Sequence, residues 1–173
     1  MIRTVSVVDA IKFEVFEDGP YEDDIVLSYR AKFARTIIND RPILEYVEEC
    51  EQRIARDGGL DEELIGDYME QFANTLYRYL TNKDCRLFDN TTIGLMVCGG
   101  CLDEGCWPLF VKMDEKQDFI TWFDFYNPYV CGDGCCGPLV DGKPYDIGPF
   151  HFARNEFEKA VEDLKEQLWK DGK

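Results

Sequence analysis

A segment rich in cysteine and glycine, residues 97–109, constrains the fold of this chain more than any other feature of its sequence. Cys98, Cys101 and Cys106 follow an apolar, strand-like run, and two glycines separate the first two cysteines. A segment of this kind binds a metal, forms disulfides, or makes a tight turn that accepts only small residues. Which of the three applies decides most of what the sequence predicts about function.

Three more cysteines follow between residues 131 and 136, on the far side of a predicted β-hairpin. Structural zinc is held by four ligands in a tetrahedron, and two cysteines separated by two residues are typical of half of such a site. Because the hairpin can bring the two groups together, one interpretation of these cysteines is a structural zinc site. Its ligands are Cys98, Cys101, Cys131 and Cys135, with Cys106 and Cys136 as alternates.

Two other interpretations of these cysteines stay open. In the first, they bind no metal and are reduced, partly buried residues around glycine turns, since free cysteine is among the most buried residue types. In the second, Cys98 and Cys101 cycle between dithiol and disulfide. Reactive pairs of that kind usually place the first thiol at a helix N-terminus, whereas the residues after Cys101 lack the pattern of a helix.

The order of apolar patterns predicts a single α+β domain over residues 1–173, with a mostly antiparallel sheet of five or six strands covered by about three helices. The expected segments are N-terminal strands in 2–38, helices in 40–80, cysteine-containing strands with a long loop in 91–153, and a C-terminal helix in 155–170. A chain of 173 residues, 45% of them hydrophobic, is long enough to bury a core without disulfides.

Apolar spacing also predicts particular placements within these segments. In the helical segment, Cys50 lies on the apolar stripe of a first helix, and a second helix spans residues 61 to about 80. In the hairpin before the long loop, alternation puts Trp122, Asp124 and Tyr126 on one face of the sheet. Because Cys50 lies on the apolar stripe of the first helix, we expect it to be a small core residue.

Acidic residues dominate the charge, because 35 of them against 19 basic residues give a formal net charge of −16. This charge argues against binding to nucleic acid or to an anionic membrane, and it is compatible with a basic protein partner. We expect adjacent acids such as Asp103 and Glu104 to lie on a solvated face. No apolar run approaches the ~18 residues of a membrane span, and the first residues lack the pattern of a signal peptide. We therefore expect a cytoplasmic protein whose cysteines stay reduced unless they bind metal.

Four short motifs occur in order between residue 95 and about residue 160: CGGC at 98–101, GCWPL at 105–109, ITWFDF at 120–125 and GPFHF at 148–152. This pattern (CGxC…GCWPL, TWxxF and GPFxF) resembles an uncharacterised family of bacterial proteins known mainly as hypothetical proteins. The resemblance covers about a third of the chain. Because the family has no established activity, the resemblance implies no catalytic residues.

The sequence holds no convincing catalytic set. Its one histidine, His151, is expected on a strand where it faces away from Phe150 and Phe152, and the common hydrolase and nucleotide-binding motifs are missing. We predict a non-catalytic, acidic, protein-binding module with a cysteine-rich hairpin, of which an inhibitor or immunity-type protein is a special case. The alternative is a thiol- or metal-dependent enzyme centred on Cys98, Cys101 and the loop of residues 131–136.

Overall fold

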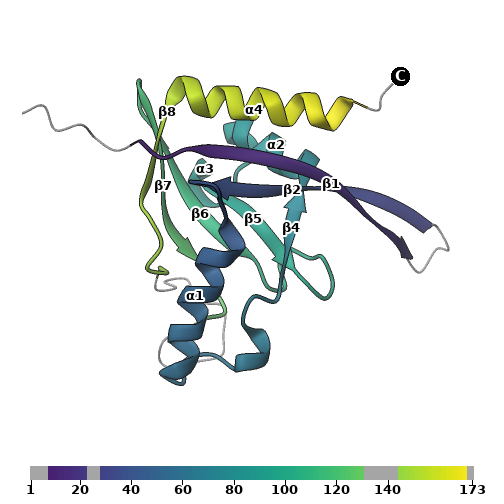
Figure 1. The fold of residues 1–173 in the computed structure, drawn as a ribbon, viewed down its shortest axis with the longest axis vertical. Helices are drawn as coiled ribbons and strands as arrows, with labels where there is room; N and C mark the ends of the chain where they lie inside the picture. Colours follow the sequence, from purple (N-terminus) through teal and green to yellow (C-terminus); the bar gives the residue numbers. More distant parts are fainter. Residues whose placement is uncertain (1–7, 23–27, 131–143, 171–173) are drawn as a thin grey trace, which may run out of the picture.

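An antiparallel sheet runs through most of the chain, and helices pack against it (Figure 1). The structure, a computed structural model, describes residues 8–22, 28–130 and 144–170. Within these ranges eight strands form one sheet in which each pairing of strands is antiparallel, and four α-helices accompany it. The predicted α+β class and the mostly antiparallel sheet are confirmed, although the sheet has more strands than expected.

The strands are β1 (Ile11–Glu22), β2 (Ser28–Ile38), β3 (Arg41–Pro42), β4 (Tyr68–Phe72), β5 (Thr92–Cys98), β6 (Leu109–Glu115), β7 (Phe119–Tyr126) and β8 (Phe150–Ala153). The helices are α1 (Ile43–Arg56), α2 (Ala73–Thr81), the short α3 (Phe88–Thr91) and α4 (Arg154–Trp169), with single 3-10 turns η1 (Glu62–Leu64) and η2 (Lys83–Cys85). The spatial order is β1-β2-β4-β5-β6-β7-β8, and β3 pairs with β2 beside this path. Among the described helices, none combines the length and the apolar character needed to cross a lipid bilayer.

Part of the predicted second helix is a strand. The spacing of Tyr68, Phe72 and Leu76 fits a helical stripe, but Tyr68 pairs with Cys98 of β5 and Phe72 pairs with Phe33 of β2. A helix over residues 61–80 would leave β2 and β5 without the strand between them. Pairing on both edges therefore outweighs the local period, and the helix α2 begins only at Ala73.

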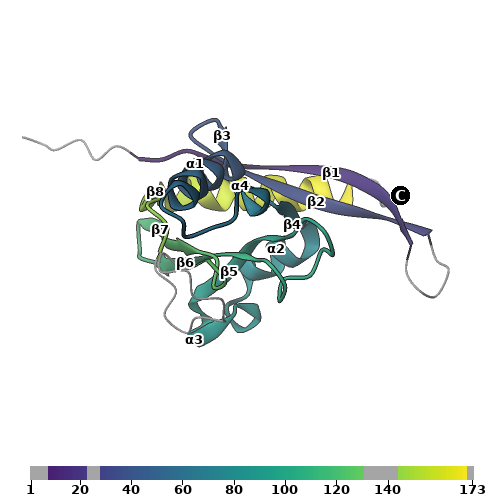
Figure 2. The same cartoon turned by 90° about the horizontal axis from the view of Figure 1, so that it is seen from below.

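Helix α4 lies along β1 and also reaches β7 and β8, at the other end of the strand order (Figure 1). Its buried residues are Phe157, Ala160 and Leu164, and it packs on β1, β7, β8 and α2. The Gln167 side chain accepts a hydrogen bond from the Val15 backbone at 2.9 Å and donates one to the Phe13 carbonyl at 3.0 Å. These bonds satisfy backbone groups on the outer edge of β1. Beyond this contact, the ribbon of β1 and β2 extends past the rest of the sheet (Figure 2).

A bulge in β7 changes which side chains face the core. Asp124 has a φ of 52°, and at this point β7 gains one residue relative to β6. As a result Trp122 and Phe125 are both fully buried, while Asp124 and Tyr126 are only partly buried. The predicted shared face of Trp122, Asp124 and Tyr126 is wrong, because a bulge reverses the alternation beyond it.

The predictions for two single residues are confirmed. Cys50 is a buried core residue of α1. His151 is exposed on β8, where its Nδ1 lies 3.1 Å from the Thr121 hydroxyl, whereas its neighbours Phe150 and Phe152 are buried.

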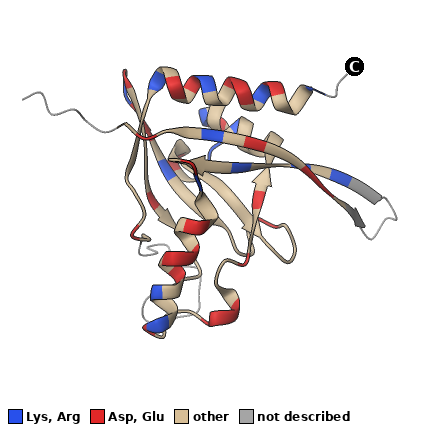
Figure 3. Cartoon of the chain, viewed as in Figure 1, with Lys and Arg blue, Asp and Glu red and all other residues tan. Residues whose placement is uncertain are grey.

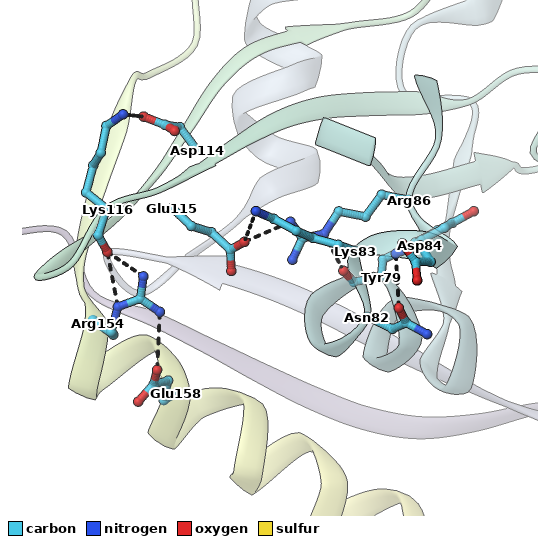
Figure 4. A network of polar contacts seen from close by, with 10 residues as sticks. All are labelled: Tyr79, Asn82, Lys83, Asp84, Arg86, Asp114, Glu115, Lys116, Arg154 and Glu158. Carbon is cyan, nitrogen blue, oxygen red and sulfur yellow. Dashed lines mark hydrogen bonds and ion pairs between the residues drawn. The ribbon is translucent and has the colours of Figure 1, made fainter. Parts of the chain in front are cut away.

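A buried arginine connects η2 to β6 (Figure 4). The Arg86 side chain, 2% exposed, donates from Nε to the Tyr79 carbonyl at 2.8 Å and from Nη1 to Glu115 Oε2 at 3.1 Å. Lys83 lies 3.5 Å from the same carboxylate oxygen. Burial raises the pKa of Glu115, but the two cations outweigh it and hold this pKa below its usual 4.5.

Candidate metal centre

Strand β5 ends at Cys98 in a tight turn that carries Cys101 and Cys106. The Leu102 N–H donates to the Cys98 carbonyl at 2.9 Å, and the N–H groups of Cys98 and Cys106 both donate to the Asp103 carbonyl at 3.3 Å. Leu102 itself has a φ of 61°. The backbone therefore folds back on itself and returns Cys106 to Cys98. Residues 98–106 are called the cysteine turn below.

A close approach between the cysteine turn and the chain before β4 requires glycine at position 99. The Gly99 N–H donates to the Asp67 carbonyl oxygen at 3.1 Å. A Cβ on Gly99 would lie 2.8 Å from Asp67 Oδ1 and 3.2 Å from the Asp67 carbonyl carbon. Part of this crowding involves backbone that cannot easily move, so the first glycine of Cys-Gly-Gly-Cys is needed for the approach.

The sulfur atoms of Cys98, Cys101 and Cys106 all lie within 4.8 Å of one another. Zinc–thiolate bonds of about 2.3 Å place two sulfurs of a tetrahedral site about 3.8 Å apart, so a small contraction lets these thiols share one ion. Cys98 is buried, while Cys101 and Cys106 are exposed. The three cysteines can therefore hold a metal ion whose outer side faces solvent.

The cysteine turn favours the thiolate form of Cys98. Burial raises the pKa of Cys98, but hydrogen bonds from the backbone N–H groups of Cys101 and Gly100, and from the thiols of Cys101 and Cys106, bring it below its usual 9.0. Hydrogen bonds to Cys101 and Cys98 instead raise the pKa of the Cys106 thiol to about 12. Metal ligation requires thiolates and releases their protons. Cys98 thus loses its proton more readily than an ordinary cysteine, and a bound cation would displace the proton of Cys106.

Glu104, in the middle of the cysteine turn, ties the turn to the sheet. Its carboxylate accepts a hydrogen bond from Gln71 Nε2 at 3.0 Å and another from the Tyr79 hydroxyl at 2.8 Å. Gln71 also donates to the Gly94 carbonyl at 3.1 Å. The carboxylate lies over Gly94, where a Cβ would overlap Glu104 Oε1.

An aromatic group stands beside the cysteine turn. Trp107, next to Cys106, stacks on Tyr129 with ring centroids 6.3 Å apart, and its ring lies 6.5 Å from that of Tyr68. The Tyr129 hydroxyl donates to the Gly105 carbonyl at 2.6 Å. These contacts hold the chain that follows β7 against the cysteine turn.

A buried carboxylate supports this aromatic group. Glu51 of α1, 0% exposed, accepts hydrogen bonds from a backbone N–H at 2.8 Å, the Tyr68 hydroxyl at 2.6 Å and the Tyr145 hydroxyl at 2.7 Å. Asn127 Nδ2 donates to the Tyr68 hydroxyl at 2.9 Å. Burial raises the pKa of Glu51, and the three donors offset this only in part. Because Tyr68 is the strand partner of Cys98, the network also fixes the strand behind the first thiol.

The structure brings together two of the four predicted ligands, Cys98 and Cys101, and adds the alternate Cys106. The remaining predicted ligands and the second alternate lie outside the described residues: Cys131, Cys135 and Cys136. The structure thus supplies three thiols to the centre, and the identity of a fourth ligand stays a prediction.

Sequence reasoning missed two carboxylates at this centre. The expectation of a solvated face holds for Asp103, which is exposed, and is wrong for Glu104, which is partly buried and hydrogen-bonded over Gly94. The available signal was a glycine inside an apolar strand, because such a glycine marks the close approach of another group. Glu51 gave no comparable signal, since it is one of several acids on α1.

Comparison of the chain with protein-family models, with curated proteins and with solved structures found no match in any of the three. No activity is therefore carried to the cysteine turn from a related protein, and its function has to be inferred from the side chains. The resemblance to an uncharacterised bacterial family stays a prediction.

Proposed function

We propose that Cys98, Cys101 and Cys106 hold a structural zinc ion in a non-catalytic, acidic, cytoplasmic protein that binds another protein. The observation that carries the zinc site is the convergence of three thiols within 4.8 Å. Soft thiolate ligands favour zinc over hard ions such as magnesium and calcium. Backbone N–H groups directed at the Cys98 sulfur support this ligand set, because they stabilise its thiolate.

A closed structural zinc site takes a fourth protein ligand. Tyr129 contacts the cysteine turn through the Gly105 carbonyl, and Cys131 follows Tyr129 by two residues. Consecutive Cα atoms lie about 3.8 Å apart, so two residues add at most about 7.6 Å of chain beyond Tyr129. We propose a fourth thiolate from the predicted pair Cys131 and Cys135, with Cys136 as the alternate.

The zinc proposal is tested by measuring the metal content of untagged protein purified without chelators. About one zinc per chain is expected for the wild type, with a large loss in Cys98→Ser, Cys101→Ser and Cys106→Ser. Cys85→Ser is the matched control, because Cys85 is another free cysteine outside the cysteine turn. Wild-type protein without stoichiometric zinc, even after incubation with zinc under reducing conditions, would refute the proposal.

The second candidate function is a metal-dependent enzyme, and one observation favours it. Cys101 and Cys106 are exposed, and three protein ligands plus water is the arrangement of catalytic zinc sites. Cobalt substitution separates the two functions. In a closed site, the visible spectrum of bound cobalt is unchanged by added cyanide or imidazole, and serine replacement of one cysteine among residues 131–136 alters it. In an open site the added ligands shift the spectrum.

The proposed protein partner is basic, because the chain carries a net charge of −16. Acidic residues are prominent on α1 and η1 (Figure 3), and Glu62 and Glu63 are exposed. Affinity capture from native cells should recover a partner with wild-type protein and lose it with the double variant Glu62→Lys/Glu63→Lys. Since exposed charges are screened by salt, capture should also weaken as salt rises. A partner retained equally by the variant at high salt would contradict an electrostatic role.

A further inference from the structure

Glu104 is placed differently from the other acids near the cysteine turn. It lies in sequence between two of the proposed ligands, Cys101 and Cys106, and its carboxylate is hydrogen-bonded to strand β4 and helix α2. Its two carboxylate oxygens are each used: Oε1 accepts from Gln71 on β4, and Oε2 accepts from Tyr79 on α2. One side chain therefore joins the middle of the cysteine turn to two other elements of the fold.

Strand β5 has space for the Glu104 carboxylate because it carries a glycine at position 94. Gly94 is an interior residue of β5, every residue of which is buried, and a Cβ there would overlap Glu104 Oε1. The atoms it would meet, Glu104 Oε1 and Cδ and Gln71 Nε2, lie at the far ends of flexible side chains, so an alanine at position 94 would displace the carboxylate and crowd its Gln71 partner rather than disrupt the backbone. Gly94 is thus the residue that leaves room for Glu104 to reach Gln71 and Tyr79.

We propose that Glu104 is a positioning residue for the zinc centre, holding Cys101 and Cys106 beside Cys98 before the metal binds. The inference rests on the proposed zinc site. A ligand set that is already ordered does not lose binding free energy to the ordering of its loop. Groups outside the coordination sphere that orient ligands typically change metal affinity by about 10- to 100-fold when they are removed.

Two single variants test this role by different means. Glu104→Ala removes the carboxylate, and Gly94→Ala displaces it while leaving Glu104 in the sequence. Both are expected to weaken zinc binding by about 10- to 100-fold, measured at 25 °C by competition with a chromophoric chelator. Glu104→Gln should retain nearly wild-type affinity, because its amide oxygen can accept from Gln71 and its amide nitrogen can donate to the Tyr79 hydroxyl oxygen.

The double variant Gly94→Ala/Glu104→Ala gives the sharpest test. If Gly94 acts only by making room for Glu104, then the double variant binds zinc no more weakly than Glu104→Ala alone. Independent effects would multiply, so that two losses of about 10-fold would give about 100-fold. A multiplicative loss would overturn the assignment of Gly94 to this role.

Glu63→Ala is the matched control, because it removes one exposed acid and the same charge from η1. If Glu104 contributes only to general stability, Glu104→Ala would lower the unfolding midpoint of the metal-free protein and leave the zinc dissociation constant unchanged. That result would overturn the inference. If wild-type protein binds zinc and all variants bind it equally, only the inference about Glu104 fails. If wild-type protein binds no zinc, the proposed function fails with it.

Discussion

Replacing Glu51 by alanine tests how strongly the buried network beneath the cysteine turn holds α1 on the sheet. The change removes the acceptor for one backbone N–H and for the hydroxyls of Tyr68 and Tyr145. A buried donor left without an acceptor costs about 1–3 kcal/mol. The two hydroxyls already lie 3.4 Å apart and can partly satisfy each other. We therefore expect a loss of about 3–5 kcal/mol, a large share of the roughly 5–15 kcal/mol that stabilises a typical domain.

The free energy of unfolding in urea at pH 7, with saturating zinc for every variant, measures this loss. Glu49→Ala is the control on the same helix, because Glu49 is exposed and pairs with Arg41 at the surface, where such a pair contributes only about 0–1 kcal/mol. Tyr145→Phe removes one of the three donors and should cost about 1–2 kcal/mol. A Glu51→Ala loss within about 1 kcal/mol of the Glu49→Ala loss would refute the reasoning.

The same carboxylate makes a pH prediction whose sign follows from its raised pKa. Burial raises the pKa of Glu51 in the folded state above its usual 4.5. At pH values between 4.5 and this raised pKa, the folded state therefore binds more protons than the unfolded state. The contribution of Glu51 to stability is therefore greatest below pH 4.5, falls as pH rises through the raised pKa, and is constant above it. Glu51→Gln removes this titration. The unfolding free energy of the wild type minus that of Glu51→Gln should fall with rising pH, and a rise would contradict the prediction.

Three further predictions concern other parts of the fold. Arg86→Met should cost about 2–3 kcal/mol in urea unfolding at pH 7, because Glu115 loses its closest cation. Since the pKa of Glu115 is lowered, the pair stabilises the fold above pH 4.5, and the cost should shrink as pH falls through the lowered pKa. Phe152→Ala should cost about 3–5 kcal/mol, because Phe152 is 0% exposed between Trp122 and Phe157, whereas Phe119→Ala, at a position 38% exposed, should cost much less in the same assay. Free zinc at 100 times its dissociation constant should stabilise the protein by about 2.7 kcal/mol, a gain that a chelator removes and that Cys98→Ser lacks.

Local patterns were sufficient to predict those helices and strands that the spacing of consecutive apolar residues marks on its own. The apolar stripes of α1 and α4 and the continuous apolar run of β5 are properties of consecutive residues, and the sequence shows them directly. Whether Tyr68 and Phe72 form a helix or a strand depends instead on β2 and β5, which lie on either side of them in space. The bulge at Asp124 likewise depends on the register between β6 and β7. Pairing between distant segments is not encoded in the spacing of either segment alone.

The candidate metal centre likewise contains residues that local spacing predicts and residues whose roles depend on distant parts of the chain. The gap of two residues between Cys98 and Cys101 predicted two of the grouped thiols, because the ligand pair lies in one short turn. Cys106 was only an alternate, since its return to Cys98 depends on the hydrogen bonds of Asp103. The sequence indicated a close approach at Gly94 without naming Glu104 as its partner, and it did not distinguish Glu51 from surface acids, because the hydrogen-bond partners of both, including Tyr79 and Tyr145, come from distant parts of the chain.

The most direct test of the zinc centre is a metal measurement combined with a count of protected thiols on the same sample. Mass spectrometry of native, untagged protein should give about one zinc per chain. Alkylation before denaturation should leave Cys98, Cys101 and Cys106 unmodified until a chelator is added, although Cys101 and Cys106 are exposed. Protein that carries no zinc after incubation with it, and whose Cys101 and Cys106 are alkylated equally fast with and without added zinc, would contradict the account.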